Sequence, residues 1–246
     1  MTTKGTKEWA DSNVNIYNGC SNNCIYCYAR QMAIRFKRKT KNNWKIMKPN
    51  LKTMSKGFKK RKGRIMFPTS HDITKENLDQ CIIILNRLLQ SKNNVLITTK
   101  PDPDCIKNIC NLLYHYKKQI QFRFTITSMN DETLQLWEPD APLFKNRMKA
   151  LNLAHEMGFK TSISIEPFLD FNPISLILKV QDFVTETIWI GPMNNFRTKN
   201  TRLKQIKVNY TKDNLLLIQY LIKNNENIQH KKIRYKDAFI NKIERK

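Results

Sequence analysis

The chain has 246 residues, which is enough for one domain, or two small ones, at roughly 100–200 residues each. An apolar fraction of 40% excludes wholesale disorder, and 6 Gly and 9 Pro exclude a collagen-like or low-complexity chain. No stretch approaches the roughly 18 consecutive apolar residues of a membrane span, and residues 1–7 carry no apolar signal segment. We expect a cytoplasmic monomer without a membrane partner, whose six cysteines are metal ligands or core residues rather than disulfides.

The excess positive charge is concentrated in one segment. The chain carries 44 Lys and Arg against 20 Asp and Glu, and fifteen of the basic residues lie in 30–64, which has no acidic residue. The segment also holds Trp44, Met47, Met54 and Phe58. Basic side chains interleaved with aromatic ones can follow a phosphate backbone and stack on bases. The pattern leaves two interpretations open, a solvated basic face or contact with DNA or RNA through Arg30–Arg64.

Short apolar runs alternate with longer amphipathic ones along most of the chain. The predicted strands are Val14–Tyr17, Arg64–Phe67, Val95–Thr99, Gln121–Thr127, Lys160–Ile165 and Thr187–Ile190. The predicted helices are Lys75–Leu89 with Thr74 as its cap, one that starts at Asp102-Pro103, Pro142–Met157 with a stop at Gly158, Pro173–Phe183 and Asn214–Lys223.

Repeated strand–helix alternation implies an α/β fold with a parallel sheet, either a partial barrel or an open sheet. Functional side chains are then expected in the loops at the carboxyl ends of the strands. We assign 1–210 to this domain, with 30–64 as a basic insertion, and 211–246 to a C-terminal helix followed by a polar, basic tail.

Three cysteines follow the first predicted strand. Cys20, Cys24 and Cys27 have the spacing C-x3-C-x2-C. Thiolates suit iron–sulfur clusters and zinc alike, but a structural zinc site needs a fourth Cys or His nearby. The next candidates in the chain, His71 and Cys81, are far away. The spacing therefore favours a cubane cluster with one iron that lacks a protein ligand, and a zinc loop is the alternative.

This cysteine spacing, with Tyr26 just before the third cysteine, resembles the signature of the radical S-adenosylmethionine (SAM) superfamily. Further segments resemble the branch of spore photoproduct lyase and "DNA repair photolyase" proteins, and several of them a phage-associated relative of that branch. They are Phe67–Asp72, Thr99–Pro101, Phe122–Ser128, Trp137–Pro142 with Arg147, Ser164–Pro167 and Ile188–Gly191. The resemblance spans about Val14 to Met193. It implies a partial (β/α)6 barrel with a short C-terminal helical and basic extension.

The resemblance also implies the cofactors and the reaction type. Cys20, Cys24 and Cys27 would bind a [4Fe–4S] cluster, and the methionyl part of SAM would chelate the fourth iron. One electron, from a donor such as flavodoxin or ferredoxin, would then cleave SAM to methionine and a 5′-deoxyadenosyl radical that abstracts hydrogen from the substrate. The role of the protein is to position SAM against one C–H bond.

Six further residues match positions that bind SAM in this superfamily. Tyr26 is expected beside the adenine, Ser70 and Asp72 near the methionine amino group, and Lys100 near the carboxylate or ribose. Thr127 and Ser128 end the fourth predicted strand, a usual position for contacts with the ribose. For Asp72 and Ser128 a helix N-cap is the alternative role, and for Lys100 it is a solvated surface position.

Three residues are candidates for direct roles in the reaction. Tyr28 follows the third cysteine, where the lyase has a tyrosine that takes part in radical transfer; His71 lies in the loop after the second strand; and Glu166 ends the fifth strand. Packing, structural hydrogen bonding and a salt bridge are the respective alternatives. Arg147 is expected to pair with Glu138 as a structural clamp. Pro68 stands where the lyase has its cysteine hydrogen donor, which argues against reversal of thymine dimers by the same route.

The predicted activity is radical-based modification or repair of a nucleic acid. A radical SAM enzyme that acts on a small molecule, peptide or protein is the first alternative. A non-catalytic iron–sulfur or zinc module that binds nucleic acid is the second, and the intact cysteine motif together with Lys100 disfavours it.

Overall fold

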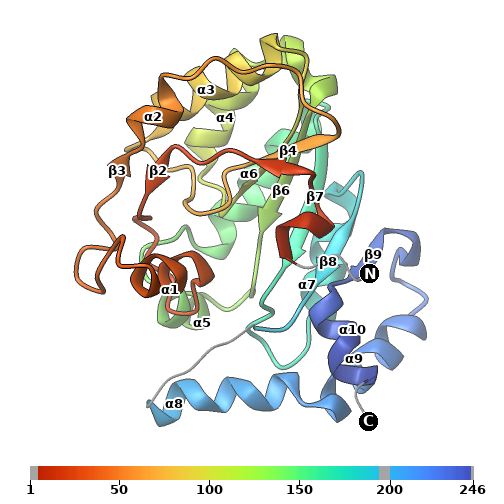
Figure 1. Cartoon of the computed structure of the whole chain (residues 1–246). Helices are drawn as coiled ribbons and strands as arrows, with labels where there is room; N and C mark the ends of the chain where they lie inside the picture. The colour runs from red at the N-terminus through yellow and green to blue at the C-terminus, as the bar shows by residue number, and fades with distance from the viewer. Residues whose placement is uncertain (1–4, 194–199, 245–246) are drawn as a thin grey trace.

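Seven parallel strands form one sheet in the computed structural model of the chain, which describes residues 5–193 and 200–244. The order is β1-β4-β5-β6-β7-β8-β9, and Figure 1 shows the strands curling into an open barrel. The strands are β1 (Ser12–Asn13), β4 (Arg64–Phe67), β5 (Asn94–Thr99), β6 (Ile120–Thr125), β7 (Lys160–Ile165), β8 (Ile188–Ile190) and β9 (Ile233–Tyr235). A separate antiparallel pair consists of β2 (Tyr17–Asn18) and β3 (Lys48–Pro49).

Helices between the strands cover the outer face of the sheet. The helices α3 (Leu78–Gln90), α4 (Pro103–Leu112) and α6 (Phe144–Glu156) lie there, and each buries apolar side chains in the core. The others are α1 (Tyr28–Arg35), α2 (Leu51–Met54), α5 (Asp131–Trp137), α7 (Ile174–Val180), α8 (Thr201–Lys204), α9 (Lys212–Lys223) and α10 (Asp237–Glu244). In the described part of the chain, no helix is long and apolar enough to cross a membrane.

The two faces of β6 differ in chemistry. The rings of Phe122 and Phe124 stack with centroids 5.2 Å apart, and Phe122 also meets Phe159, so this face belongs to the apolar core under the helices. Arg123 projects to the opposite face, where its Nε donates to Ser162 Oγ on β7 (3.1 Å). The inner face of the barrel is therefore polar at this level.

The predicted α/β class is confirmed, and five predicted strands coincide with β4 to β8 within two residues. The first prediction, Val14–Tyr17, falls between β1 and β2 instead. The Val14 N–H donates to Met66 O on β4, whereas Ile16 O accepts from Asn50 N, next to β3. The chain leaves one sheet for the other here, which shortens both strands.

Two predicted helix boundaries are confirmed and one is wrong. Asp102 caps α4 by accepting from the backbone N–H groups of Asp104 and Cys105, and Gly158 adopts a φ of +75° after α6. Thr74 does not cap α3. Its own N–H donates to the side chain of Asn77 (2.9 Å), which holds residues 74–77 in a turn, so the helix begins about one turn late.

The sheet continues past the boundary predicted at residue 211. β9 lies in the segment predicted as a polar, basic tail, yet Ile233 pairs with Ile188 and Tyr235 with Ile190 of β8. Because Lys231, Lys232 and Arg234 lie in or next to it, so short a strand has no recognisable hydrophobic pattern in the sequence. The segment from 211 onward thus forms the last edge of the barrel, and Figure 1 places it next to the N-terminus.

Phe239 on α10 tests whether this C-terminal segment shares the core. The side chain is fully buried, so Phe239→Ala should lower the free energy of unfolding by about 3–5 kcal/mol in urea titrations. Tyr220→Ala, at a side chain 64% exposed on α9, is the control and should change it little. A loss below about 1 kcal/mol for Phe239→Ala would mean that the segment folds apart from the barrel.

Candidate functional site

The three cysteines lie in one loop between β2 and α1. Gly19 opens the loop with a φ of +103°, and a Cβ at this position would lie 2.7 Å from the carbonyl oxygens of Trp44 and Ile46. Only glycine fits without displacing that backbone. The Cys20 N–H donates to Trp44 O (3.1 Å), so the basic segment supports the loop from one side.

The other end of the loop is fixed by two helices. The Ile25 N–H donates to the carbonyl of Trp137, the last residue of α5 (2.9 Å). Cys27 caps α1, its Sγ accepting from the Arg30 N–H (3.4 Å). These contacts hold the backbone of the loop at both ends.

The chemistry of the three thiols fits an iron–sulfur cluster. All three cysteines are free; Cys20 and Cys24 are buried, and Cys27 is half-buried. Burial raises the thiol pKa of each, so binding of iron must displace protons. Among the described side chains, no three of His, Cys, Asp and Glu converge on a single metal ion.

Asp72 joins the cysteine loop to the carboxyl end of β5. Its Oδ1 accepts from the Lys100 N–H (2.7 Å) and the Thr99 hydroxyl (2.9 Å), and its Oδ2 accepts from the Asn22 side chain (2.9 Å). Cys20 Sγ lies 3.9 Å from the same Oδ2. The helix-cap alternative does not apply, because α3 begins after Asn77. The predicted contact with the methionine amino group stays a prediction.

A buried carboxylate lies under the cysteine loop. Glu138 forms an ion pair with Arg147, and both side chains have no exposed surface. The Tyr26 hydroxyl and the Thr127 hydroxyl (2.8 Å) both donate to Glu138 Oε1. Burial alone would raise the pKa of Glu138, but Arg147, Lys100 and the Tyr26 hydroxyl lower it below its ordinary value, which favours the ionised carboxylate. The predicted clamp between Glu138 and Arg147 is confirmed.

Lys100 is the cation that faces the loop. Its Nζ lies 5.6 Å from the centroid of the Tyr26 ring, a cation–π contact. Burial would lower the pKa of Lys100, but the negative charges available at Cys24, Tyr26 and Glu138 raise it well above its ordinary value. The surface position considered as the alternative is wrong, because only 9% of the residue is exposed. A pocket of about 410 Å³ beside the loop brings Lys100 together with Asn22.

The predicted ribose contacts, Thr127 and Ser128, are fully buried after β6. The Thr127 hydroxyl donates to Glu138, and the Ser128 hydroxyl donates to Asp170 Oδ1 (2.6 Å). Because both hydroxyls already donate their hydrogen, each could only accept a hydrogen bond from a ribose. Ser128 does not cap α5, since Asn130 does. Ser70 is half-buried, and its N–H donates to Asn15 Oδ1 (3.0 Å), which holds the loop after β4 in place.

The two candidate reactive residues on this side differ in exposure. His71 is 6% exposed; its Nε2 accepts from the Ile16 N–H (3.2 Å), and its Nδ1 lies 3.0 Å from the Asp72 carbonyl oxygen. Both ring nitrogens therefore contact backbone groups, and burial lowers the pKa of His71 to about 4. Tyr28, in contrast, is 64% exposed at the start of α1. Reactive roles for both stay predictions.

Glu166 lies across the barrel mouth from the cysteines, at the end of β7. Burial raises its pKa to about 7, although Lys236 opposes the shift. Lys236 Nζ is 3.8 Å from Glu166 Oε2, so the salt bridge considered as the alternative role is present. A role of Glu166 toward substrate or ribose stays a prediction.

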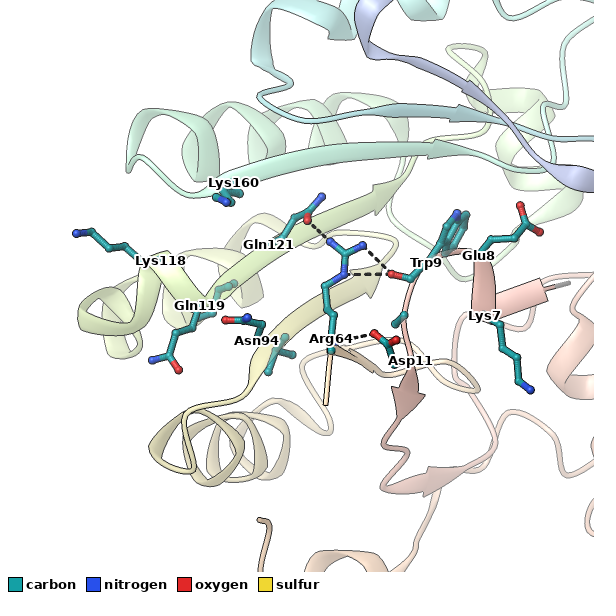
Figure 2. Close-up of a pocket in the computed structure, with 14 residues that line it drawn as sticks. Lys7, Glu8, Trp9, Asp11, Arg64, Asn94, Lys118, Gln119, Gln121 and Lys160 are labelled. Atoms are coloured by element: carbon teal, nitrogen blue, oxygen red, sulfur yellow. Dashed lines mark hydrogen bonds between the residues drawn. The ribbon is translucent and has the colours of Figure 1, made fainter. Parts of the chain in front are cut away.

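A second, larger pocket of about 540 Å³ lies at the opposite end of the barrel. It is lined by the first residues of four strands, Arg64, Asn94, Ile120 and Lys160. Figure 2 shows Arg64, Asn94 and Lys160 around it. Active sites of parallel β/α barrels lie at the carboxyl ends of the strands, and the amino ends serve stability. The candidate site is therefore the one at the cysteine loop.

Residues 14–172 match the family model described as the radical SAM superfamily. The chain belongs to the radical SAM superfamily. It is accordingly a radical SAM enzyme whose cofactors are a [4Fe–4S] cluster and SAM. When bound, these cofactors supply a 5′-deoxyadenosyl radical. That the cysteine loop and Lys100 hold them at the mouth of the barrel stays a prediction.

Two curated proteins are similar to this chain over most of its length. The uncharacterized protein MJ0683 of Methanocaldococcus jannaschii is 24% identical over 233 residues, which cover 95% of this chain and 86% of the relative. The uncharacterized protein ORF301 of Acidianus two-tailed virus is 23% identical over 185 residues, or 68% of this chain and 58% of the relative.

Two solved structures share the fold at low identity. Streptococcus suis SuiB bound to precursor peptide SuiA has a TM-score of 0.53 and 13% identity over 92% of this chain. A spore photoproduct lyase mutant with dinucleoside spore photoproduct has a TM-score of 0.53 and 14% identity over 80% of this chain. The chain spans 48% of the former and 60% of the latter. At these identities both similarities show the fold alone.

Several residues of the site were not found from the sequence. Asn15, Asn22 and Asp170 hold the loops around the predicted residues, and Lys236 comes from the unpredicted edge strand. Asn22 lies inside the cysteine motif, which was a usable signal. The others are common polar residues in irregular segments, and only the folded chain brings them to the site.

Glu138 should be the residue on which the loop depends most. Glu138→Gln removes the counter-charge of a fully buried arginine and should cost about 3–5 kcal/mol of unfolding free energy. Asp104→Asn breaks the fully exposed pair with Lys75 and should leave the unfolding free energy nearly unchanged. Urea titration of both variants measures the difference. Equal, small effects would show that the buried pair does not stabilise this region.

His71 should make stability depend on pH. Its pKa is about 4 in the folded chain and about 6.5 when unfolded, so the unfolded state binds the proton more readily. The contribution is present above pH 6.5 and is lost as the pH falls toward 4, at most about 3 kcal/mol. His71→Gln should flatten this slope, and the exposed His230→Gln should keep it. An unchanged slope in His71→Gln would contradict the buried, neutral assignment.

Proposed function

We propose that this radical SAM enzyme modifies or repairs a nucleic acid that the basic segment 30–64 holds beside the barrel mouth. The proposal rests on the exposed positive charge of this segment. Eleven of the fifteen basic side chains in the segment are exposed, namely Arg35, Lys37, Arg38, Lys41, Lys45, Lys48, Lys52, Lys56, Lys59, Lys60 and Lys62. Such a run of positive charge without an acidic residue suits a phosphate backbone.

The segment is attached directly to the cysteine loop. It begins in α1, which Cys27 caps, and returns through β3, which pairs with β2 just before the loop. The Arg30 guanidinium also reaches Lys41 O (3.5 Å). A strand bound along these charges would thus lie next to the cofactors.

The aromatic groups available for stacking differ from those predicted. Trp44 is 1% exposed, and Met47, Met54 and Phe58 pack against the core, so these four do not present free faces. Phe36 is 58% exposed instead. The guanidinium carbons of Arg35 and Arg38 each lie 5.8 Å from its ring centroid. An exposed ring between two arginines suits an unpaired base.

The fold alone supports two substrate classes. One structure of similar fold holds a dinucleoside photoproduct and the other a precursor peptide, with equal TM-scores. The basic segment favours the nucleic acid, and with it membership of the spore photoproduct lyase branch. We further propose that an electron-transfer protein such as flavodoxin or ferredoxin reduces the cluster.

Release of 5′-deoxyadenosine should establish the reaction. The anaerobically reconstituted, reduced protein should release it from SAM, and DNA or RNA should stimulate the release. Cys27→Ala should abolish both cluster binding and release. Cys110→Ala, in the buried core of α4, should retain both. Release that a peptide stimulates and no nucleic acid does would favour the peptide alternative. No release from protein with a full cluster would favour a binding module.

Salt dependence tests the basic segment separately. If Arg35, Arg38 and Lys41 contact phosphates, replacing all three with Gln should lower the slope of log affinity against log salt by about 2 for a single strand. A matched triple of exposed lysines elsewhere, Lys179, Lys223 and Lys231, should leave the slope unchanged when replaced in the same way. Fluorescence titration of a labelled oligonucleotide at several salt concentrations measures both. Equal slopes would reject this surface.

A further inference from the structure

A buried cation lies opposite the cysteine loop at the mouth of the barrel. Lys236 directly follows β9, the edge strand, and is 3% exposed. Its neighbours Glu166 and Gly191 follow β7 and β8, so all three lie at the carboxyl ends of their strands. This is the end where a parallel barrel binds its substrate.

The position of Lys236 is tightly specified by its surroundings. Its Nζ lies 4.2 Å from the ring centroid of Trp9 and 5.7 Å from that of Trp189. A Cβ on Gly191 would lie 2.8 Å from Lys236 Cγ and 3.0 Å from Glu166 Cγ. The side chains of Lys236 and Glu166 therefore fill the space that a side chain at position 191 would need. The stem is fixed, and the ammonium is held in place.

A second buried cation lies behind the same two rings. The Arg123 guanidinium carbon is 4.6 Å from the Trp9 centroid and 5.4 Å from that of Trp189. Its Nη1 is buried without a hydrogen-bond partner, and burial with the nearby charge of Arg64 lowers its pKa to about 9. Glu166 is partly protonated near neutral pH, because burial raises its pKa to about 7. Lys236 and Arg123 thus place two buried cationic groups against the same pair of rings, with the Glu8 and Glu166 carboxyl groups as the acidic neighbours of Lys236.

A carboxylate from the N-terminal segment occupies this cationic position. Glu8 Oε1 lies 2.9 Å from Lys236 Nζ, and Glu8 Oε2 accepts from the N–H of Asp237, the first residue of α10 (3.2 Å). An ammonium together with a backbone N–H at a helix N-terminus is a recurrent way to bind an anion. The carboxylate of Glu8 shows that the position accepts one.

The segment that carries Glu8 is separate from the sheet. It is the single turn Gly5–Glu8, whose first three residues are exposed, and it precedes β1 at the opposite edge of the sheet. In Figure 2 the Trp9 carbonyl is held by Arg64, with N–O distances of 3.1 and 2.7 Å, while Glu8 points away from that contact. Lys236 Nζ also donates to Gly5 O (3.2 Å), so a ligand at this position would have to replace two contacts of the turn, while Trp9 keeps its own contact with Arg64.

We propose that Lys236 and the Asp237 N–H form the binding site for a phosphate group of the substrate, and that Glu8 occupies it when no substrate is bound. The phosphate is that of a nucleic acid, and in this respect the inference rests on the proposed function. The substrate would then reach from the basic segment across the cofactors to Lys236. Entry of its phosphate displaces Glu8 and frees the Gly5–Glu8 turn.

Binding of two probes to the reconstituted protein tests the site. Inorganic phosphate and a short single-stranded oligonucleotide should both bind about tenfold more tightly to Glu8→Gln, because a tethered competitor is removed. The matched control Asp104→Asn should bind as the wild type does. Lys236→Met keeps the packed stem, and it should weaken both probes and cancel the gain of Glu8→Gln in the double variant.

Hydrogen exchange tests the same site in the unmodified chain. The N–H groups of Trp9 and Ala10 both donate to Thr6 O, so phosphate that displaces Glu8 should speed their exchange. Equal phosphate binding by Glu8→Gln and Asp104→Asn, or exchange that phosphate does not change, would overturn the proposal. Tighter binding of phosphate but no binding of the oligonucleotide would keep the anion site and reject the nucleic-acid substrate.

Discussion

A buried carboxylate that must be neutralised organises the candidate site. The Glu138 side chain has no exposed surface. Arg147 and Lys100 balance its charge, and its carboxylate accepts hydrogen bonds from the Tyr26 and Thr127 hydroxyls. Those partners come from the cysteine loop, from the ends of β5 and β6, and from α6. A charge buried in this way is stable only when its partners stay in place. The carboxylate therefore fixes the position of the loop relative to the sheet.

The barrel mouth has two sides with different chemistry. The cysteine loop, Lys100 and Asp72 occupy the side of β4, β5 and β6, where backbone and side-chain hydrogen bonds leave little freedom. Glu166 and Lys236 occupy the side of β7, β8 and β9, where Glu8 of the N-terminal turn supplies one of the charges. If this turn moves as we propose, the side opposite the cysteine loop could adjust to admit a substrate.

The sequence predicts which residues gather at the cysteine loop better than it predicts those on the opposite side of the barrel mouth. The three cysteines and the ends of β4 to β8 are local patterns, and parallel strands bring their carboxyl ends together. Lys236 and Trp9 lie 227 positions apart in the chain and meet only because β9 completes the sheet next to the N-terminal segment. A three-residue strand among lysines and arginines carries too little hydrophobic pattern to be recognised.

We propose that the three cysteines of one loop bind a cubane cluster with one iron open to SAM. Mössbauer spectroscopy of the iron-labelled, anaerobically reconstituted protein, with and without SAM, tests this directly. We expect a [4Fe–4S] spectrum in which SAM shifts the signal of one iron and leaves the other three unchanged. A cluster of fewer irons, or four irons that do not respond to SAM, would contradict it.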